Sequence, residues 1–144
     1  MNTEPIIIEQ DYPNAAAAVW SALTDNSEMK QWYFVLPEFK AEIGFEFTFE
    51  GGTEQKSYLH LCRVTEVIAG RKLAYSWRYD GYPGISYVSF EVSPNGDGAR
   101  LTLTHSGLET FPGDNPDFAK HNFVAGWTQI TGTSLRNYLA GKQG

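Results

Sequence analysis

Two hydrophobic periods divide the chain into a central part and a C-terminal part. Between Phe39 and His105, apolar and polar residues alternate, most clearly from Phe45 to Glu50, where phenylalanine occupies every second position. A period of two predicts β-strands with one buried and one solvated face. With an isoleucine-rich first strand added, the expected strands are residues 4–12, 45–50, 57–68, 73–79, 88–92 and 101–105.

Turn residues separate these expected strands. The turns are predicted at Gly51-Gly52, Ala69–Arg71, Gly81–Gly84 and Pro94–Gly98, the last with a strong hairpin signature. Alternation is weaker along residues 57–68, which favours a β-bulge there. Short strands linked by turns predict an antiparallel meander with one covered face.

The C-terminal part has a helical period instead. Its apolar residues recur at steps of three to five and predict one helix over residues 116–140, with Asn115 as N-cap and Pro116 in the first turn. At ~1.5 Å per residue this helix would be about 37 Å long. The predicted apolar stripe consists of Phe123, Trp127, Ile130, Leu135 and Tyr138.

Two short helices are expected after the first strand. Asn14 would cap the first, over residues 15–24, and Ser27 would cap a second that ends near Trp32. The order of strand, two helices, five or six strands and long helix predicts an α+β fold. In this helix-grip arrangement a curved antiparallel sheet wraps around the C-terminal helix. The space left between them is filled by aromatic side chains or by a ligand.

Composition and charge narrow the possible partners. The 144 residues suit one domain, 1–144, and their 15% aromatic content suits a ligand cavity or an aromatic core. A net charge of −6 argues against nucleic acid or an anionic membrane as the main partner. No signal peptide or membrane span is recognisable, so we expect no membrane insertion, and the single Cys62 excludes an internal disulfide. We expect a cytoplasmic protein.

An ordered series of short motifs resembles the START-like (Bet v 1-like, helix-grip) superfamily, and most closely its branch related to the activator of Hsp90 ATPase (AHSA1-like). The segments that carry the resemblance are Val19–Asp25 with Trp32, Gly44–Phe47, Val64–Val67, Leu73–Trp77, Leu101–Gly107, and Gly126-Trp127 with Leu135.

The resemblance implies a hydrophobic small-molecule ligand under the C-terminal helix. We expect no cofactor. Some relatives are cyclases or other enzymes, and others bind proteins. Relatives that stimulate Hsp90 have a further N-terminal domain that we do not expect here, although a chaperone partner stays an alternative. The resemblance carries over no catalytic motif, and a homodimer is left open.

Three histidines are candidates for chemistry. His60 and Cys62 share a strand face and could hold a ligand or a metal, but we favour a structural role because no thiolate cluster or paired histidines accompany them. His105 should point toward the helix, where it would hydrogen-bond a ligand or be satisfied within the core. His121 is expected in solvent. No nucleophile motif appears, and Asp25, Glu28 and Glu38, expected near the cavity mouth, are too few for an acid–base pair.

Aromatic residues are the better signal for a ligand site. Tyr75, Trp77 and Tyr79 form a ladder on one strand face, and polar-tipped aromatic rings suit a ligand with rings and a few polar atoms. Phe111 and Leu108 could form a lid or a hydrophobic staple at the helix start. The predicted ligand-binding residues are Trp32, Phe47, His60, Trp77, Tyr79, His105, Phe123 and Trp127.

Three candidate functions follow from these features. The leading one is binding of a hydrophobic or amphipathic small molecule in an internal cavity. The second is a small cyclase or hydrolase-like enzyme that uses polar groups such as His105 and Tyr79. The third is a module that interacts with a chaperone.

Overall fold

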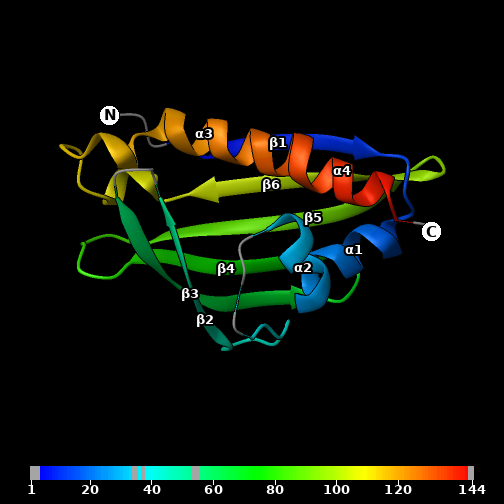
Figure 1. Ribbon diagram of the computed structural model, residues 1–144, viewed down its shortest axis with the longest axis horizontal. Helices are drawn as coiled ribbons and strands as arrows, with labels where there is room; N and C mark the ends of the chain where they lie inside the picture. Colours follow the sequence, from blue (N-terminus) through cyan, green and yellow to red (C-terminus); the bar gives the residue numbers. More distant parts are fainter. Residues whose placement is uncertain (1–3, 34–35, 37, 53–55, 143–144) are drawn as a thin grey trace.

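The computed structural model describes residues 4–33, 36, 38–52 and 56–142. Its centre is one antiparallel sheet with the strand order β1-β6-β5-β4-β3-β2 (Figure 1). The last five strands form the predicted meander, and β1 pairs with β6. The strands are β1 (Ile6–Tyr12), β2 (Glu46–Gly52), β3 (Ser57–Ile68), β4 (Lys72–Tyr79), β5 (Ser86–Asn95) and β6 (Gly98–Ser106).

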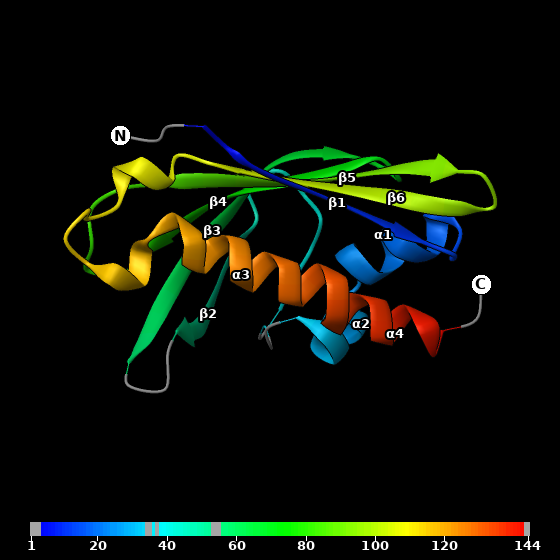
Figure 2. The same ribbon diagram turned by 90° about the horizontal axis from the view of Figure 1, so that it is seen from above.

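The helices lie on one face of the sheet. Figure 2 shows the C-terminal helical segment crossing beneath the strands, while β2 and β3 bend toward the same side. This confirms the α+β helix-grip fold. The helical elements are α1 (Ala16–Thr24), α2 (Asn26–Trp32), the 3-10 turns η1 (Leu108–Thr110) and η2 (Pro116–Phe118), α3 (Lys120–Gln129), the π-helical segment η3 (Ile130–Ser134) and α4 (Leu135–Ala140).

The faces of the strands follow the predicted alternation. Leu73, Tyr75, Trp77 and Tyr79 are all buried against the helices. The predicted bulge in β3 is confirmed by a register shift between Val64 and Glu66. A bulge bends a strand and increases its twist, which fits the curvature at this side of the sheet.

Turn positions were predicted with mixed success. The hairpin between β5 and β6 is confirmed, with Asn95 paired to Gly98. Gly51 and Gly52 were wrongly expected to turn the chain, because both still pair with β3, opposite Tyr58 and Ser57. Two glycines are a turn signal, but ladder pairing extends through them here.

The C-terminal helix does not begin at Pro116. Residues Pro116–Phe118 form a 3-10 turn, and Asn115 caps that turn by accepting a hydrogen bond from the Asp117 amide at 3.0 Å. Ala119 is extended, and α3 starts at Lys120. This break lets Phe118 pack into the core, where its ring stacks on Tyr79 with 4.7 Å between centroids.

A π-helical segment shifts the buried stripe of the C-terminal helix. Its buried residues follow steps of four, whereas Ile130 and Tyr138, expected in the stripe, are half-buried. In a regular α-helix each step of four would rotate the side chain by about 40°. The wider π turn compensates for this rotation and keeps the stripe on the sheet. The buried stripe is Phe123, Trp127, Thr131, Leu135 and Leu139.

Both early helices have caps other than those expected. Ala15 occupies the N-cap of α1 without a side-chain hydrogen bond, whereas Asn14 donates to the Leu139 carbonyl oxygen at 3.0 Å. Asp25, and not Ser27, caps α2, because its Oδ1 accepts from the Ser27 amide at 2.9 Å. Asn14, which was expected to cap α1, therefore binds the C-terminal end of α4 instead.

Candidate functional site

A cavity of about 370 Å³ lies between the sheet and α3. Its walls come mainly from β3, β4, η2 and α3, with one residue each from β2 and η3. This volume is within the usual range of small-molecule sites. The lining residues are Gly51, Tyr58, His60, Trp77, Tyr79, Asp117, Phe118, Asn122, Phe123, Gly126, Trp127 and Ile130.

The structure brings five of the eight predicted ligand-binding residues to this cavity. They are His60, Trp77, Tyr79, Phe123 and Trp127.

The other three predicted residues lie away from the cavity. Trp32 is buried beneath α1, and its indole N–H donates to the Ala22 carbonyl oxygen at 3.0 Å. Phe47 packs edge-on against Phe39 and Tyr75, nearer the α2 side of the core. His105 lies in the core behind Trp127.

His105 belongs to a closed hydrogen-bond chain. The Trp127 indole N–H donates to its Nδ1 at 2.9 Å, so Nε2 carries the ring proton and donates to Ser86 Oγ at 2.8 Å. Ser86 donates in turn to the Trp77 carbonyl oxygen at 2.9 Å. Burial lowers the pKa of His105 to about 3, so the ring is neutral. Both of its nitrogens have protein partners, which is the structural role weighed for this residue in the sequence.

His60 lines the cavity as a neutral aromatic ring. It stacks on Phe49 at 4.4 Å between centroids, and its Nδ1–H donates to the Tyr58 carbonyl oxygen at 3.0 Å. Burial lowers the pKa of His60 to about 4, although the hydrogen bond to the Tyr58 carbonyl oxygen acts in the opposite direction. Cys62 is buried on the same face, and burial raises the pKa of its thiol. Within the described ranges, no three His, Cys, Asp or Glu side chains are grouped to hold a metal.

The two tryptophans that line the cavity offer a ligand their ring surfaces, because both indole N–H groups already donate to protein acceptors. The Trp77 indole donates to the Tyr79 hydroxyl at 2.9 Å, and the Trp127 indole donates to His105. The two indoles contact each other with 5.4 Å between centroids. Burial raises the pKa of the Tyr79 hydroxyl, so it stays protonated at neutral pH.

The polar residues on one side of the cavity were not predicted from the sequence. Tyr58 donates its hydroxyl proton to Asp117 Oδ2 at 2.6 Å, and Asn115 donates to the Tyr58 oxygen at 3.4 Å. Tyr58 shares the inward face of β3 with His60, so alternation could have identified it. Asp117 could be interpreted only as a helix-start charge, because nothing local links it to a strand 59 positions earlier.

The loop before α3 packs as a wall. Phe111 is buried against Tyr79 and Phe118, with centroid distances of 5.1 and 5.6 Å, and stacks on Phe123 at 6.2 Å. This contact with α3 resembles the staple considered for Phe111. Leu108 is half-buried in η1. A lid role for the two residues stays a prediction.

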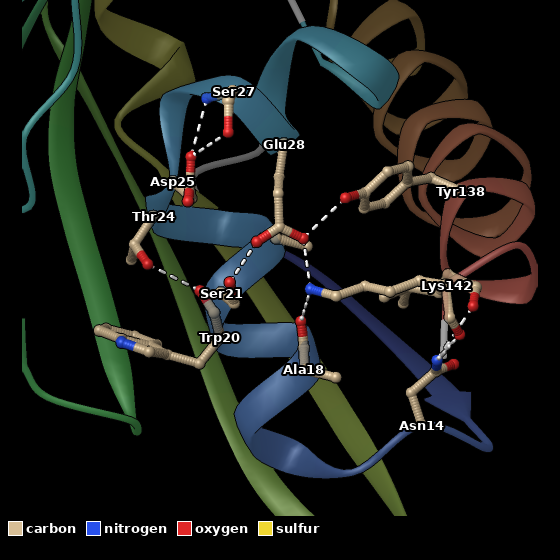
Figure 3. Close-up of polar contacts among 12 residues, drawn as sticks. Asn14, Ala18, Trp20, Ser21, Thr24, Asp25, Ser27, Glu28, Tyr138 and Lys142 are labelled. Atoms are coloured by element: carbon tan, nitrogen blue, oxygen red, sulfur yellow. Dashed lines mark hydrogen bonds and ion pairs between the residues drawn. The ribbon is translucent and has the colours of Figure 1, made fainter. Parts of the chain in front are cut away.

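The three acidic residues expected at the cavity mouth were misplaced. Asp25 caps α2, and Glu38 is an exposed partner of Lys40 at 3.8 Å. Glu28 lies at the opposite end of the helical layer, where it accepts hydrogen bonds from Ser21, Tyr138 and Lys142 (Figure 3). None of the three lines the cavity.

A second hollow, between α2 and α4, is an open groove. Its volume of about 650 Å³ exceeds that of the cavity, but it lies between two helices rather than under the sheet. Its lining combines three rings with polar side chains and a helix end: Gln31, Trp32, Tyr33, Ser134, Asn137, Tyr138 and Gly141. The cavity under α3 is the better site, because rings enclose it from several elements.

Comparison with known proteins now places the chain in a family. A family model described as activator of Hsp90 ATPase homolog 1-like protein matches residues 14–140. The chain therefore belongs to this family, as the sequence resemblance predicted. A search of curated proteins finds no match. Within the described part of the chain, no helix is both long and apolar enough to cross a membrane.

Solved structures share the fold across nearly the whole chain. Protein CV1439 from Chromobacterium violaceum is 21% identical, with a TM-score of 0.76 over 93% of this chain and 95% of that chain. MLL2253 from Mesorhizobium loti is 22% identical, with a TM-score of 0.75 over 97% and 99%. CalU16 from Micromonospora echinospora is 25% identical, with a TM-score of 0.71 over 95% and 76%. These similarities show a shared fold.

Proposed function

We propose that this protein binds a hydrophobic or amphipathic small molecule in the cavity between the sheet and α3. The observation that carries the proposal is the cavity itself, about 370 Å³ and walled mainly by aromatic rings. Such a space suits a molecule with one to three rings. The family and fold are consistent with ligand binding.

Gly126 provides a way to close the cavity without disturbing its walls. It lines the open side of the cavity at an exposed position of α3, and a methyl group added there would meet no neighbouring atom within 4 Å. Gly126→Ala should therefore be accepted and should stabilise the helix by up to ~1 kcal/mol. Gly126→Leu should instead extend four carbon atoms into the space that a ligand needs.

The test uses the fluorescent, uncharged probe N-phenyl-1-naphthylamine. We expect its emission to rise on binding to the wild type and to Gly126→Ala, and to rise much less with Gly126→Leu at equal concentration. Thermal unfolding of each variant verifies that all three are folded. Equal binding by the alanine and leucine variants would place the probe elsewhere and would contradict the proposal.

A chaperone-related role is the second candidate, and the family description is the observation that favours it. The large exposed apolar residues include Ile7, Ile43, Ile68, Tyr87 and Val124, which come from different elements. If the protein acts on a chaperone, Gly126→Leu should leave that interaction unchanged in a pull-down assay. The enzyme alternative is weaker, because both nitrogens of His105 are engaged and Tyr79 is held protonated.

A further inference from the structure

Among the described residues that line the cavity, the only formal charge is negative. Asp117 is the carboxylate among them, burial lowers the pKa of His60 and keeps its ring neutral, and raised pKa values keep Tyr58 and Tyr79 protonated. Asp117 is half-buried at the start of η2, and its Oδ2 accepts the Tyr58 hydroxyl proton. Among the described residues, no hydrogen bond of its Oδ1 is found.

Most polar hydrogens on the cavity wall are already given to protein acceptors. Five lining side chains donate in this way: Tyr58 to Asp117, His60 to the Tyr58 carbonyl oxygen, Trp77 to Tyr79, Trp127 to His105, and Asn122 to the Pro116 carbonyl oxygen at 2.7 Å. What remains toward the cavity is mainly acceptor oxygen and ring surface, together with the Tyr79 hydroxyl proton, for which no acceptor is found among the described residues. A ligand therefore has to supply positive charge or donors, and an anion would meet few donors.

Aromatic rings pack around Tyr58, whose hydroxyl group binds this carboxylate. Six rings other than His60 line the cavity, and the Tyr58 ring lies 5.2 Å from Phe118 and 5.7 Å from Tyr79 between centroids. The faces of such rings are electron-rich and attract a cation within about 6 Å. The six are Tyr58, Trp77, Tyr79, Phe118, Phe123 and Trp127.

From this arrangement we propose that the ligand is an organic cation, an amphipathic molecule whose amine or quaternary ammonium group lies beside Asp117 among the aromatic rings. The inference rests on the proposed ligand-binding function and narrows its ligand class. The apolar part of the molecule fills the deeper space toward Trp77 and Trp127. The cation offsets the charge of Asp117 and contacts ring faces of the cavity wall. One of these rings, Tyr58, already has the exposed Lys56 ammonium 5.3 Å from its centroid.

Two probes of the same shape separate charge from size. Phenyltrimethylammonium is a permanent cation, and tert-butylbenzene replaces its nitrogen with carbon. Binding is followed by the fluorescence of Trp77 and Trp127, which both line the cavity. We expect the wild type to bind the cation more tightly than tert-butylbenzene.

Asp117→Asn tests the role of the carboxylate. The amide oxygen can still accept from Tyr58, so the local structure should be kept. The substitution should weaken binding of the cation about ten-fold and leave tert-butylbenzene unchanged. Asp114→Asn is the matched control, because Asp114 is an exposed residue of the segment just before η2 and is not in the cavity lining. It removes the same formal charge and should alter neither affinity by more than about two-fold.

The outcomes separate this inference from the function on which it rests. If tert-butylbenzene binds as tightly as the cation or more tightly, the cavity proposal stands and the cation inference is wrong. Equal losses with Asp117→Asn and Asp114→Asn would also overturn it, because they would show a long-range effect of net charge. If neither these probes nor N-phenyl-1-naphthylamine bind, both proposals fail.

Discussion

The two ends of the C-terminal helical segment meet the rest of the protein in different ways. At the α4 end, Leu135 and Leu139 are buried, and polar side chains fasten the chain to α1 and α2 (Figure 3). Glu28 accepts from Tyr138 at 2.7 Å and from Lys142, while Asn14 donates to the Leu139 carbonyl oxygen. At the α3 end, aromatic rings and the cavity separate the helix from β3 and β4.

This difference suggests how a small fold keeps a space open beneath a helix. A stiff helix anchored firmly at one end needs only a few large residues to hold the other end above the sheet. Trp127 is one such residue, since it contacts Trp77 and hydrogen-bonds His105. The π-helical segment between the two ends keeps the buried stripe aligned across both.

Truncation of Trp127 should have the largest effect, because this residue supports the cavity end. It is 2% exposed, and its loss would leave both a void and an unpaired His105 nitrogen. We expect Trp127→Ala to lower the free energy of unfolding by ~3–5 kcal/mol, measured by urea denaturation. Val124→Ala on the exposed side of α3 is the control and should change stability by less than ~0.5 kcal/mol. A loss below 1 kcal/mol for Trp127→Ala would mean that this end of the helix is not packed as described.

The strands and their buried faces were predicted from the sequence better than the helix caps and the π-helical segment. Period-two alternation identified the strands and the buried faces of Tyr75, Trp77 and Tyr79, because that signal is local to each strand. Helix caps are harder to predict, because a capping side chain can also bond to distant groups. Asn14 donates to a carbonyl oxygen 125 positions later and does not cap the adjacent helix α1. The spacing of apolar residues could not predict the π-helical segment, because this segment keeps the buried residues on one side of the helix.

The candidate site shows the same limit. Sequence reasoning found the aromatic residues His60, Trp77, Tyr79 and Trp127, because strand and helix faces can be read from spacing. The pairing of Tyr58 with Asp117 depends on how the sheet curves and on the break at the start of α3, and neither follows from neighbouring residues.

The anchored end is tested by Glu28→Gln, the second largest expected effect. The Glu28 side chain is 15% exposed, and its charge holds Lys142 and Tyr138 in place. We expect a loss of about 2 kcal/mol in unfolding free energy at pH 7, since hydrogen bonds to charged groups are lost. Glu38→Gln is the control, because that carboxylate is 67% exposed. Ligand affinity at the α3 end should stay within about two-fold of the wild type if the two ends act separately.

The stability difference between the wild type and Glu28→Gln should also depend on pH. Burial raises the pKa of Glu28, but hydrogen bonds from Lys142, Ser21 and Tyr138 outweigh it and hold the pKa below its usual value of 4.5. A lowered folded-state pKa means that the stabilisation is complete above about pH 4.5 and is lost as pH falls through the folded value. The stability difference between wild type and Glu28→Gln should therefore be constant near neutral pH and shrink below that point. A difference that does not change down to pH 3 would show that the carboxylate charge is not responsible.

The smallest expected effect concerns Lys56, at the outer side of the cavity end. Its ammonium lies 5.3 Å from the centroid of Tyr58 and 5.4 Å from that of Tyr82, yet it is exposed and does not line the cavity. If the ligand is a cation near Tyr58, this like charge opposes its binding. Lys56→Gln should then raise the affinity for phenyltrimethylammonium roughly two-fold in low salt, as expected for an exposed charge pair.

Salt and a second lysine complete this last test. The gain from Lys56→Gln should fade at 1 M salt, where charges more than about 3 Å apart are screened. Lys40→Gln removes an equally exposed charge whose partner is Glu38, and it should leave the affinity unchanged. A weaker affinity after Lys56→Gln would show that Lys56 supports the ligand rather than repelling it. Because a cation gains nothing from a neighbouring ammonium, that result would contradict the placement of the cation near Tyr58 and would count against the role assigned to Asp117.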